Sequence, residues 1–263
     1  MPSATEAQPL QREIAPEVHI EVKDLTMAYG SFVVQQDLTF TVRRGDIFII
    51  MGDSGCGKST LLRHMVGLKR PARGQVLYEG KDFWAADPAA RKNFMRNFGM
   101  SYQGSALWSS MTLAENIALP LQEYTDLGEA DMREIAQLKL ALVGLSGFED
   151  YYPSEISGGM MKRAGLARAM ALDPDILYFD EPSAGLDPIS SSLLDELILQ
   201  LRDSLGATVV NDTHDLASIF AIGNNSVFLD AEKKTKTATG DPKQLRDEAT
   251  DPKLHRFLTR SGA

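Results

Sequence analysis

The sequence has 263 residues, of which 43% are apolar and 24% charged, so it is long enough to form one large globular domain. The formal charge of −9 at pH 7 excludes the basic surface on which nucleic-acid binding depends, and we expect no nucleic-acid partner. The single cysteine, Cys56, cannot form an internal disulfide, so the fold needs no oxidising compartment.

The N-terminal segment, residues 1–16, contains acids and prolines and lacks the apolar stretch of a secretory signal. We expect it to be a flexible tail, and residues 17–263 to form a single domain. No apolar run approaches the roughly 18 residues that a membrane-spanning helix requires. The chain is therefore expected in the cytoplasm, with any membrane role passing through a partner.

The first part of this domain reads as β-structure. Apolar and polar residues alternate from Val18 to Val42, with a turn at Gly30, which predicts a strand pair at the edge of a sheet. The sequence DIFIIM, from Asp46 to Met51, predicts a buried strand. It runs directly into a glycine-rich loop and a helix that begins at about Lys58.

The middle and last parts alternate between helix and strand. Helical spacing of apolar residues within Ala114–Leu121 and Asp131–Leu142 predicts a helical subdomain over about residues 104–170. A helix is predicted for Ser191–Leu205. Three further strands are predicted, at Ile176–Asp180, Ala207–Asp212 and Ser226–Asp230. This alternation favours an α/β sheet covered on both faces. After it, residues Pro242–Thr259 form a charged amphipathic stretch.

A phosphate-binding motif lies between the predicted strand and helix. GDSGCGKST fits the pattern G-x-x-x-x-G-K-[ST], in which glycines let backbone N–H groups wrap the phosphates. Lys58 is expected to reach the β- and γ-phosphates of ATP, and Ser59 to bind Mg²⁺. The predicted nucleotide-binding residues of this loop are Gly52, Asp53, Ser54, Gly55, Cys56, Gly57, Lys58, Ser59 and Thr60.

The thiol of Cys56 lies inside this positively charged loop, and two environments are open to it. If solvent reaches the sulfur, the loop and Lys58 should lower its pKa and raise its reactivity. If the sulfur packs behind the loop, it is an inert apolar side chain.

A second motif supplies carboxylates. ILYFDE is an apolar strand that ends in Asp180, which is placed to reach the metal directly or through water. Glu181 follows at once and is the candidate general base, because it can accept a hydrogen bond from the attacking water.

Between the two phosphate motifs lies EISGGMMKRAGLARAM, whose Ser157-Gly158-Gly159 and following basic helix resemble the signature motif of ABC ATPases. The resemblance implies a P-loop NTPase (ABC ATPase) α/β core with an antiparallel β subdomain and a helical subdomain. It also implies that the signature serine and glycines close on the γ-phosphate in a partner subunit, so that the chain acts with a second copy of itself.

The remaining elements of that family match in order. Tyr29 is placed like the aromatic residue that stacks on adenine, although an ordinary edge-strand tyrosine is the alternative. Gln103 resembles the Q-loop glutamine that contacts Mg²⁺ or the water. Asp187, in GLD, resembles the D-loop aspartate that crosses to the other subunit, and His214 resembles the switch histidine that contacts the γ-phosphate.

Three local features resemble the ATPases of Mla-type phospholipid transporters: Met160 in the signature, the segment QGSALWSSMTLAENIALPL and the C-terminal DPKLHRFL. This resemblance implies ATP-driven movement of phospholipids between inner and outer membranes, at the cytoplasmic face of a bacterial inner membrane. The implied partners are a permease dimer, an MCE-domain lipid-binding protein and, in some systems, a small STAS-domain protein. The alternatives are another cargo, as in amino-acid import or lipoprotein release, or a soluble ABC protein without a transport role.

Overall fold

The computed structural model describes residues 17–259, and its larger sheet has the strand order β10-β9-β3-β8-β7-β6. Within the described residues, β9, β3, β8, β7 and β6 run parallel, and β10 pairs antiparallel with β9 at one edge. The strands are β3 (Ile47–Met51), β6 (Phe98–Ser101), β7 (Ile176–Asp180), β8 (Thr208–Asp212), β9 (Asn225–Asp230) and β10 (Thr235–Thr239). The predicted buried strands are thus confirmed.

Strand β3 is central and separates two apolar cores. Ile47, Ile49 and Met51 belong to one core, and Phe48 and Ile50 belong to the other. Every residue of the strand is buried, because successive side chains of a strand point to opposite faces and both faces of this sheet are covered.

The smaller sheet is antiparallel, with the order β2-β1-β4-β5. Its strands are β1 (Val18–Tyr29), β2 (Phe32–Arg43), β4 (Arg73–Tyr78) and β5 (Lys81–Asp82). The predicted pair Val18–Val42 is correct, but its description as an edge pair is wrong for β1, because β4 hydrogen-bonds to its free side. Helix α1 (Lys58–Met65) contacts β1 of this sheet and β7 and β8 of the larger one.

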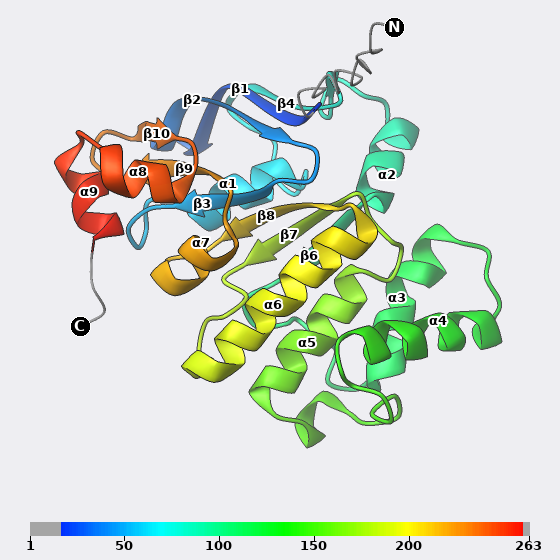
Figure 1. Cartoon of the computed structure of the whole chain (residues 1–263). Coiled ribbons are helices and arrows are strands. Elements are labelled where there is room, and N and C mark those ends of the chain that lie inside the picture. Colours follow the sequence, from blue (N-terminus) through cyan, green and yellow to red (C-terminus); the bar gives the residue numbers. More distant parts are fainter. Residues whose placement is uncertain (1–16, 260–263) are drawn as a thin grey trace, which may run out of the picture.

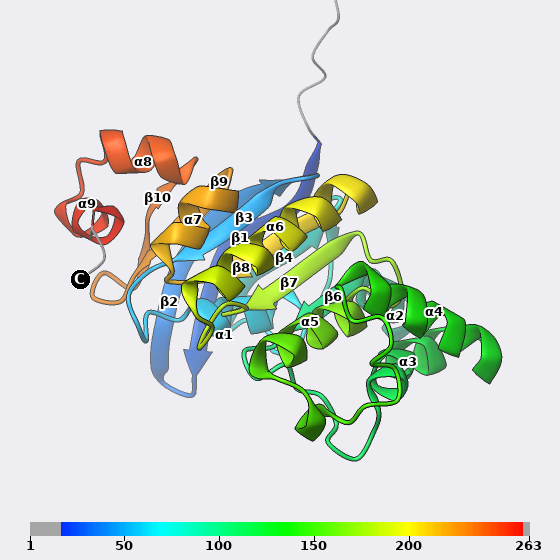
Figure 2. The same cartoon turned by 60° about the horizontal axis from the view of Figure 1, so that its bottom comes forward.

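The face of the larger sheet that does not contact α1, and one end of that sheet, are covered by helices (Figures 1 and 2). Helix α2 (Pro88–Arg96) precedes β6, and α3 (Leu113–Tyr124), α4 (Glu129–Leu142) and α5 (Gly158–Ala169) follow it. A short 3₁₀ helix, Pro153–Glu155, leads into α5. The predicted helical spacing within residues 104–170 is confirmed, since α3, α4 and α5 all lie there and pack on one another. The boundaries of a separate subdomain stay a prediction.

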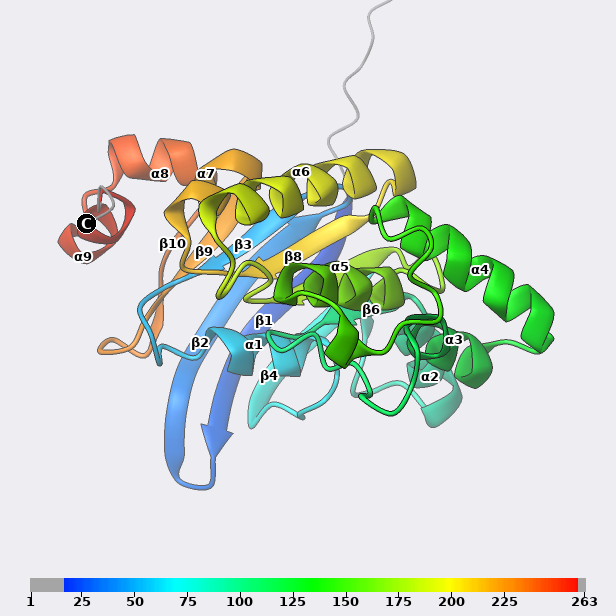
Figure 3. The same cartoon turned by 90° about the horizontal axis from the view of Figure 1, so that it is seen from below.

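The last helices are α6 (Pro188–Leu205), α7 (Leu216–Ile222), α8 (Pro242–Glu248) and α9 (Pro252–Leu258). Seen from below in Figure 3, α8 and α9 lie at the end of the molecule opposite α3 and α4. The predicted amphipathic stretch is therefore two short helices. Helix α9 buries Leu254, Phe257 and Leu258, and the Phe257 ring lies 5.2 Å from the ring of Phe228 in β9.

Among residues 17–259, no helix combines the length and apolar character that crossing a membrane requires. The tail expected at residues 1–16 lies outside the described residues.

Candidate nucleotide site

The phosphate loop connects β3 to α1, and two of its glycines are required by its shape. Gly52 has φ of 147°, and a Cβ atom there would lie 2.5 Å from the sulfur of Cys56 and 2.6 Å from the carbonyl oxygen of Leu229. Gly57 has φ of 103°, and its Cβ atom would lie 2.7 Å from the Val34 side chain. Any other residue would strain the loop at both positions, because side chains disfavour these backbone angles and no space is left for them.

A pocket of about 510 Å³ opens above this loop and gathers most of the predicted catalytic groups. Its lining residues come from the phosphate loop, the loop after β6 and the ends of β7 and β8, with two apolar side chains from α7 and α9. They are Gly52, Asp53, Ser54, Gly55, Lys58, Ser59, Gln103, Glu181, His214, Leu216 and Phe257. The carboxyl ends of parallel strands therefore converge on the phosphate loop, as expected for a ligand site in an α/β sheet.

Lys58 and Ser59 both point toward a carboxylate that the sequence analysis missed. The Nζ atom of Lys58 donates to the carbonyl of Gly52 (3.2 Å) and lies 3.9 Å from Oδ1 of Asp212. Ser59 Oγ donates to Oδ2 of Asp212 at 2.9 Å. Burial raises the pKa of Asp212 to about 7, against the opposing effects of Lys58 and Ser59. The signal available in the sequence was an acid at the end of a predicted parallel strand.

Asp180 lies on the neighbouring strand, in register with Asp212. The side chains of Ser59 and Asp180 supply hard oxygen donors of the kind that Mg²⁺ prefers. No group of three or more His, Cys, Asp or Glu in the described chain is arranged to hold a metal by itself. A magnesium ion here fits only if phosphate oxygens and waters complete its coordination, which is its usual manner of binding in phosphoryl-transfer sites.

Glu181 and His214 form a pair at the mouth of the pocket. The Nδ1 atom of His214 lies 2.8 Å from the Glu181 carboxylate. Glu181 has φ of 51°, an uncommon conformation for a residue other than glycine, and its N–H donates to the carbonyl of Asp212 at 2.9 Å. This turn aims the Glu181 side chain at the pocket instead of along β7.

Helix α5, which follows the signature motif, contacts the backbone of two segments that line the phosphate pocket. Lys162, on α5, donates through Nζ to the carbonyl of Gln103 and, at 3.4 Å, to the carbonyl of Glu181. Arg168, six residues later in the same helix, donates to the carbonyls of Ser105 (2.8 Å) and Ala106 (2.6 Å). Helix α5 is therefore attached to the Gln103 loop and to the end of β7.

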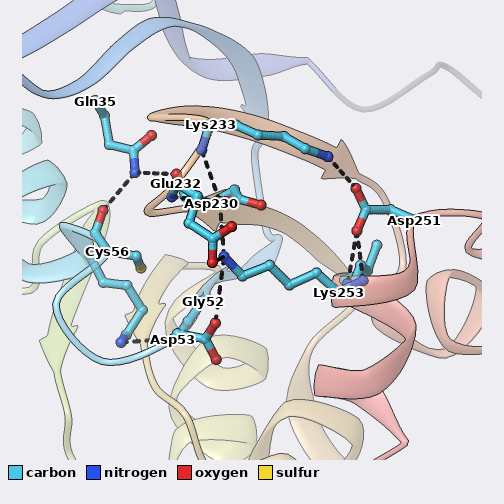
Figure 4. A network of polar contacts seen from close by, with 11 residues as sticks. Gln35, Gly52, Asp53, Cys56, Asp230, Glu232, Lys233, Asp251 and Lys253 are labelled. Atoms are coloured by element: carbon cyan, nitrogen blue, oxygen red, sulfur yellow. Dashed lines mark hydrogen bonds and ion pairs between the residues drawn. The ribbon is translucent and has the colours of Figure 1, made fainter.

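Cys56 has the buried environment. Its side chain is 1% exposed, and burial raises the pKa of its thiol to about 11 in spite of nearby Lys58. Its carbonyl accepts a hydrogen bond from Gln35 Nε2 at 2.7 Å, and the same amide group donates to the carbonyl of Asp230 at 3.1 Å (Figure 4). The alternative of a reactive, accessible thiol is therefore wrong.

The C-terminal helix also reaches the phosphate loop, which the sequence analysis did not anticipate. Figure 4 shows Lys253 extending from α9 toward Asp230 and Asp53. Its Nζ atom lies 3.0 Å from Oδ1 of Asp230 and 3.9 Å from Oδ2 of Asp53. Helix α9 therefore contacts the phosphate loop through Lys253 and contributes Phe257 to the pocket lining.

The predicted signature residues lie apart from the phosphate loop of their own chain. Ser157 and Gly159 line another hollow, of about 370 Å³, together with Leu186 and residues of α5 and α6. Ser157 Oγ caps α5 by accepting from the N–H of Met160 at 3.3 Å, with Gly158 as the first residue of the helix. Within the described chain, none of the residues that line this hollow lines the phosphate pocket.

The predicted residues Tyr29 and Asp187 also lie outside the pocket lining. Tyr29 is 49% exposed at the end of β1, and the Nζ atom of Lys69 lies 2.8 Å from its ring centroid. A hydrogen bond to Thr60 is the largest effect that lowers the pKa of the Tyr29 phenol, which places it beside α1. Asp187 caps α6, accepting from the N–H groups of Ile189 and Ser190 at 3.1 Å each.

The profile of the family described as ABC transporter matches residues 35–184, which span the phosphate loop, the signature and β7. This chain belongs to the ABC transporter ATPase family. The predicted family and fold are thus confirmed, and the chain is an ABC ATPase whose pocket has the groups expected for binding ATP.

Curated relatives of this ABC ATPase bear two different names. It is 39% identical over 241 residues to the probable ribonucleotide transport ATP-binding protein mkl of Mycobacterium tuberculosis, covering 92% of this chain and 66% of that protein. It is 38% identical over 239 residues to the intermembrane phospholipid transport system ATP-binding protein MlaF of Haemophilus influenzae, covering 91% and 89%. The chain thus spans about two thirds of the mycobacterial relative.

Solved ABC cassettes share the fold. The ATP-binding cassette MJ0796, a dimer in a post-hydrolysis state with ADP and Pi, aligns with a TM-score of 0.76 and 26% identity, covering 84% of this chain and 98% of that one. The cassette cbiO1 of Clostridium perfringens aligns with a TM-score of 0.79 and 24% identity, covering 88% and 92%, and shows the fold alone.

Proposed function

We propose that this ABC ATPase binds and hydrolyses Mg²⁺-ATP, in a pair with a second copy of itself, to drive a phospholipid transporter. The observation that carries the enzymatic part is the single pocket that gathers the phosphate loop, Gln103 and the Glu181–His214 pair. Membership of the ABC transporter family supports the same activity.

The phosphate loop and α1 bind the nucleotide. Backbone N–H groups of the loop and the N-terminus of α1 would face the phosphate oxygens, and Lys58 would add a positive charge beside them. Ser59 and Asp180 are the residues that would hold Mg²⁺, with Gln103 contacting it or the water. The bound ion would neutralise charge on the phosphate oxygens.

Glu181 is the candidate base for the attacking water. Its carboxylate lies in the pocket lining, and His214 holds it from one side at 2.8 Å. Because an ionised carboxylate only accepts hydrogen bonds, Nδ1 of His214 carries the hydrogen in this contact. Glu181 then orients the water by accepting a hydrogen bond from it, and takes its proton as the water attacks. His214 fixes the direction in which the carboxylate points.

The second copy is proposed because the signature residues Ser157 and Gly159 line a hollow distinct from the phosphate pocket of their own chain. A helix N-terminus with free N–H groups is suited to an anion, and α5 presents one beside Ser157. The dimeric state of the MJ0796 cassette supports a second copy, and we propose that the signature and Asp187 of one copy complete the nucleotide site of the other.

The cargo is proposed from the relative that matches over most of its own length. The MlaF relative is named for intermembrane phospholipid transport, and nine tenths of each chain align. We infer from this a permease dimer as membrane partner, an MCE-domain lipid-binding protein in the same system and, in some systems, a small STAS-domain protein. The ABC ATPase would act at the cytoplasmic face of a bacterial inner membrane.

The test of the cargo is to purify the complex that this chain forms in detergent-solubilised membranes and to reconstitute it into vesicles. ATP-dependent transfer of a fluorescent phospholipid, absent with Lys58→Ala, is the expected result. Stimulation of ATP hydrolysis by ribonucleotides, the cargo in the name of the mycobacterial relative, with no lipid transfer would contradict the proposal. Amino acids or lipoproteins as the stimulating cargo would contradict it equally, and recovery of the chain without any membrane protein would indicate a role outside transport.

A further inference from the structure

Asp212 is a buried carboxylate inside the nucleotide site to which no role has been assigned. It ends β8, and its side chain is on the same face of the strand as Val210, because residues two apart in a strand share a face. Val210 packs in the core that also contains Leu61 and Leu62 of α1. The strand therefore aims the Asp212 carboxylate at the start of α1, where the phosphate loop ends.

The main partner of Asp212 is the hydroxyl of Ser59. Ser59 Oγ donates to Oδ2 at 2.9 Å, a normal hydrogen bond, whereas Lys58 Nζ is 3.9 Å from Oδ1 and donates to the Gly52 carbonyl instead. Oδ1 is buried and has no hydrogen-bond partner among the described residues. A fully buried carboxylate with one oxygen unsatisfied lowers stability, so its presence calls for a use at this site.

A serine that binds a cation needs such an acceptor. Its hydroxyl has one hydrogen and two lone pairs, and a lone pair can face the metal only when the hydrogen points elsewhere. Groups that hold a ligand in this way are generally as important to a metal site as the ligand itself. Asp212 accepts the Ser59 hydrogen at 2.9 Å from a fully buried position.

We propose that Asp212 is a positioning residue of the magnesium site: its carboxylate takes the Ser59 hydroxyl hydrogen and so turns the Ser59 lone pairs toward the metal. This inference rests on the proposed function, since it requires that Ser59 binds Mg²⁺ with the nucleotide. It distinguishes Asp212 from Asp180, which occupies the neighbouring position on β7 and is the expected ligand of the metal or of its waters.

The experiment measures ATP affinity by calorimetry, once with Mg²⁺ and once with EDTA, in the full chain. Asp212→Val removes the acceptor with little change in volume, and Asp212→Asn keeps one acceptor oxygen. The matched control is Asp195→Val, because Asp195 is another buried carboxylate that accepts from a serine, Ser218, at 2.9 and 2.7 Å, and it is not in the pocket lining. Thermal melting establishes that each variant is folded.

We expect the gain in affinity that Mg²⁺ gives the wild type to fall by about 10–100-fold in Asp212→Val, the range found when a group that orients a metal ligand is removed. Asp212→Asn should lose less of the Mg²⁺-dependent gain in ATP affinity than Asp212→Val. Asp195→Val should keep all of it. Affinity for ATP without Mg²⁺ should hold or rise in Asp212→Val, since a negative charge near the phosphates is lost. In a Ser59→Ala background, Asp212→Val should cause no further loss, because the two residues act as one unit.

The inference would be overturned if Mg²⁺ raised the ATP affinity of Asp212→Val as much as it raises that of the wild type. An equal loss of affinity with and without Mg²⁺, which indicates a structural role, or an undiminished loss in the Ser59→Ala background would overturn it as well. A wild-type protein whose ATP affinity does not depend on Mg²⁺ would instead remove the proposed metal site, and this inference with it.

Discussion

His214 contacts the carboxylate of Glu181 at 2.8 Å although 33 positions separate the two residues in the chain. The side chain of Glu181 is 14% exposed and that of His214 is 64% exposed, so the histidine covers the base from the solvent side. Two loops that follow adjacent strands thus place a carboxylate and its partner at the opening of the phosphate pocket.

Replacement of the base should separate binding from hydrolysis. Glu181→Gln keeps the size of the side chain but cannot accept a proton from water, so turnover should fall at least about 100-fold. ATP affinity should remain, whereas Lys58→Ala should weaken binding. Phosphate release in the assembled complex and calorimetry with ATP measure the two effects. Turnover of Glu181→Gln at the wild-type rate would show that the base is another group.

Loss of the histidine should act through Glu181. His214→Ala leaves the carboxylate without its partner, and turnover should fall about tenfold, or ~1.4 kcal/mol, within the range for residues that share a hydrogen bond. The double variant Glu181→Gln/His214→Ala should be no slower than Glu181→Gln alone. Additive losses would mean that His214 contributes independently, for example by contacting the γ-phosphate.

Blocking the signature should prevent pairing with ATP. Ser157→Arg puts bulk and charge at the N-terminus of α5, where the proposed partner's nucleotide would lie. Sedimentation of Glu181→Gln with ATP should show a dimer, and the same protein carrying Ser157→Arg a monomer. The control Ser204→Arg changes an exposed serine at the far end of α6 and should still pair. A monomer of Glu181→Gln even with the permease present argues against shared sites.

The thiol of Cys56 should resist modification in the folded protein. It is buried with a pKa raised to about 11, so both access and the thiolate fraction are low near neutral pH. Maleimide at pH 7 should leave the native protein unlabelled and active, and should label one site after denaturation in guanidinium. Mass spectrometry counts the adducts. Rapid labelling of native protein, slowed by ATP, would restore the accessible-thiol alternative.

Ionisation of Asp195 should lower the free energy of unfolding as pH rises from about 4 to about 6. Burial raises the pKa of this carboxyl to about 6 in the folded protein, against about 3.9 when unfolded. Between those values the folded state holds the extra proton, so its contribution is complete below about pH 4 and is lost as pH rises through about 6. Asp195→Asn should remove this dependence.

The difference in unfolding free energy between wild type and Asp195→Asn should therefore shift by on the order of 2 kcal/mol in favour of the variant between pH 4 and pH 7. Urea unfolding at each pH measures it, and Ser204→Ala serves as a surface control. A difference that is constant with pH would show that Asp195 titrates alike in both states.

The sequence predicted those parts of the site that local chemistry determines. In GDSGCGKST the glycines mark the positions of unusual backbone angles, since Gly52 and Gly57 adopt φ values that only glycine tolerates. The strand ending at Asp180 and the helix starting at Lys58 follow from apolar pattern and position. The two motifs, read together, predict that Lys58 and Glu181 act in one site.

The parts that the sequence did not predict depend on register and docking. Asp212 enters the site because β8 pairs with β3 and β7 at one particular register. Lys253 reaches Asp53 because α9 packs on Phe228 of β9, more than 20 residues before it in the chain. Cys56 turns inward because the loop backbone, held by Gln35, determines its direction. None of these relationships leaves a local pattern in the amino-acid order.

One buried thiol in 263 residues also makes the wild-type chain a convenient host for engineered probes. A cysteine placed at an exposed position would be the sole accessible attachment point for a spin label or fluorophore, without first replacing any residue of the phosphate loop. Cysteines at Ser204 and at exposed Leu138 of α4 would therefore report distances between copies in the working protein, as nucleotide is added, used and released.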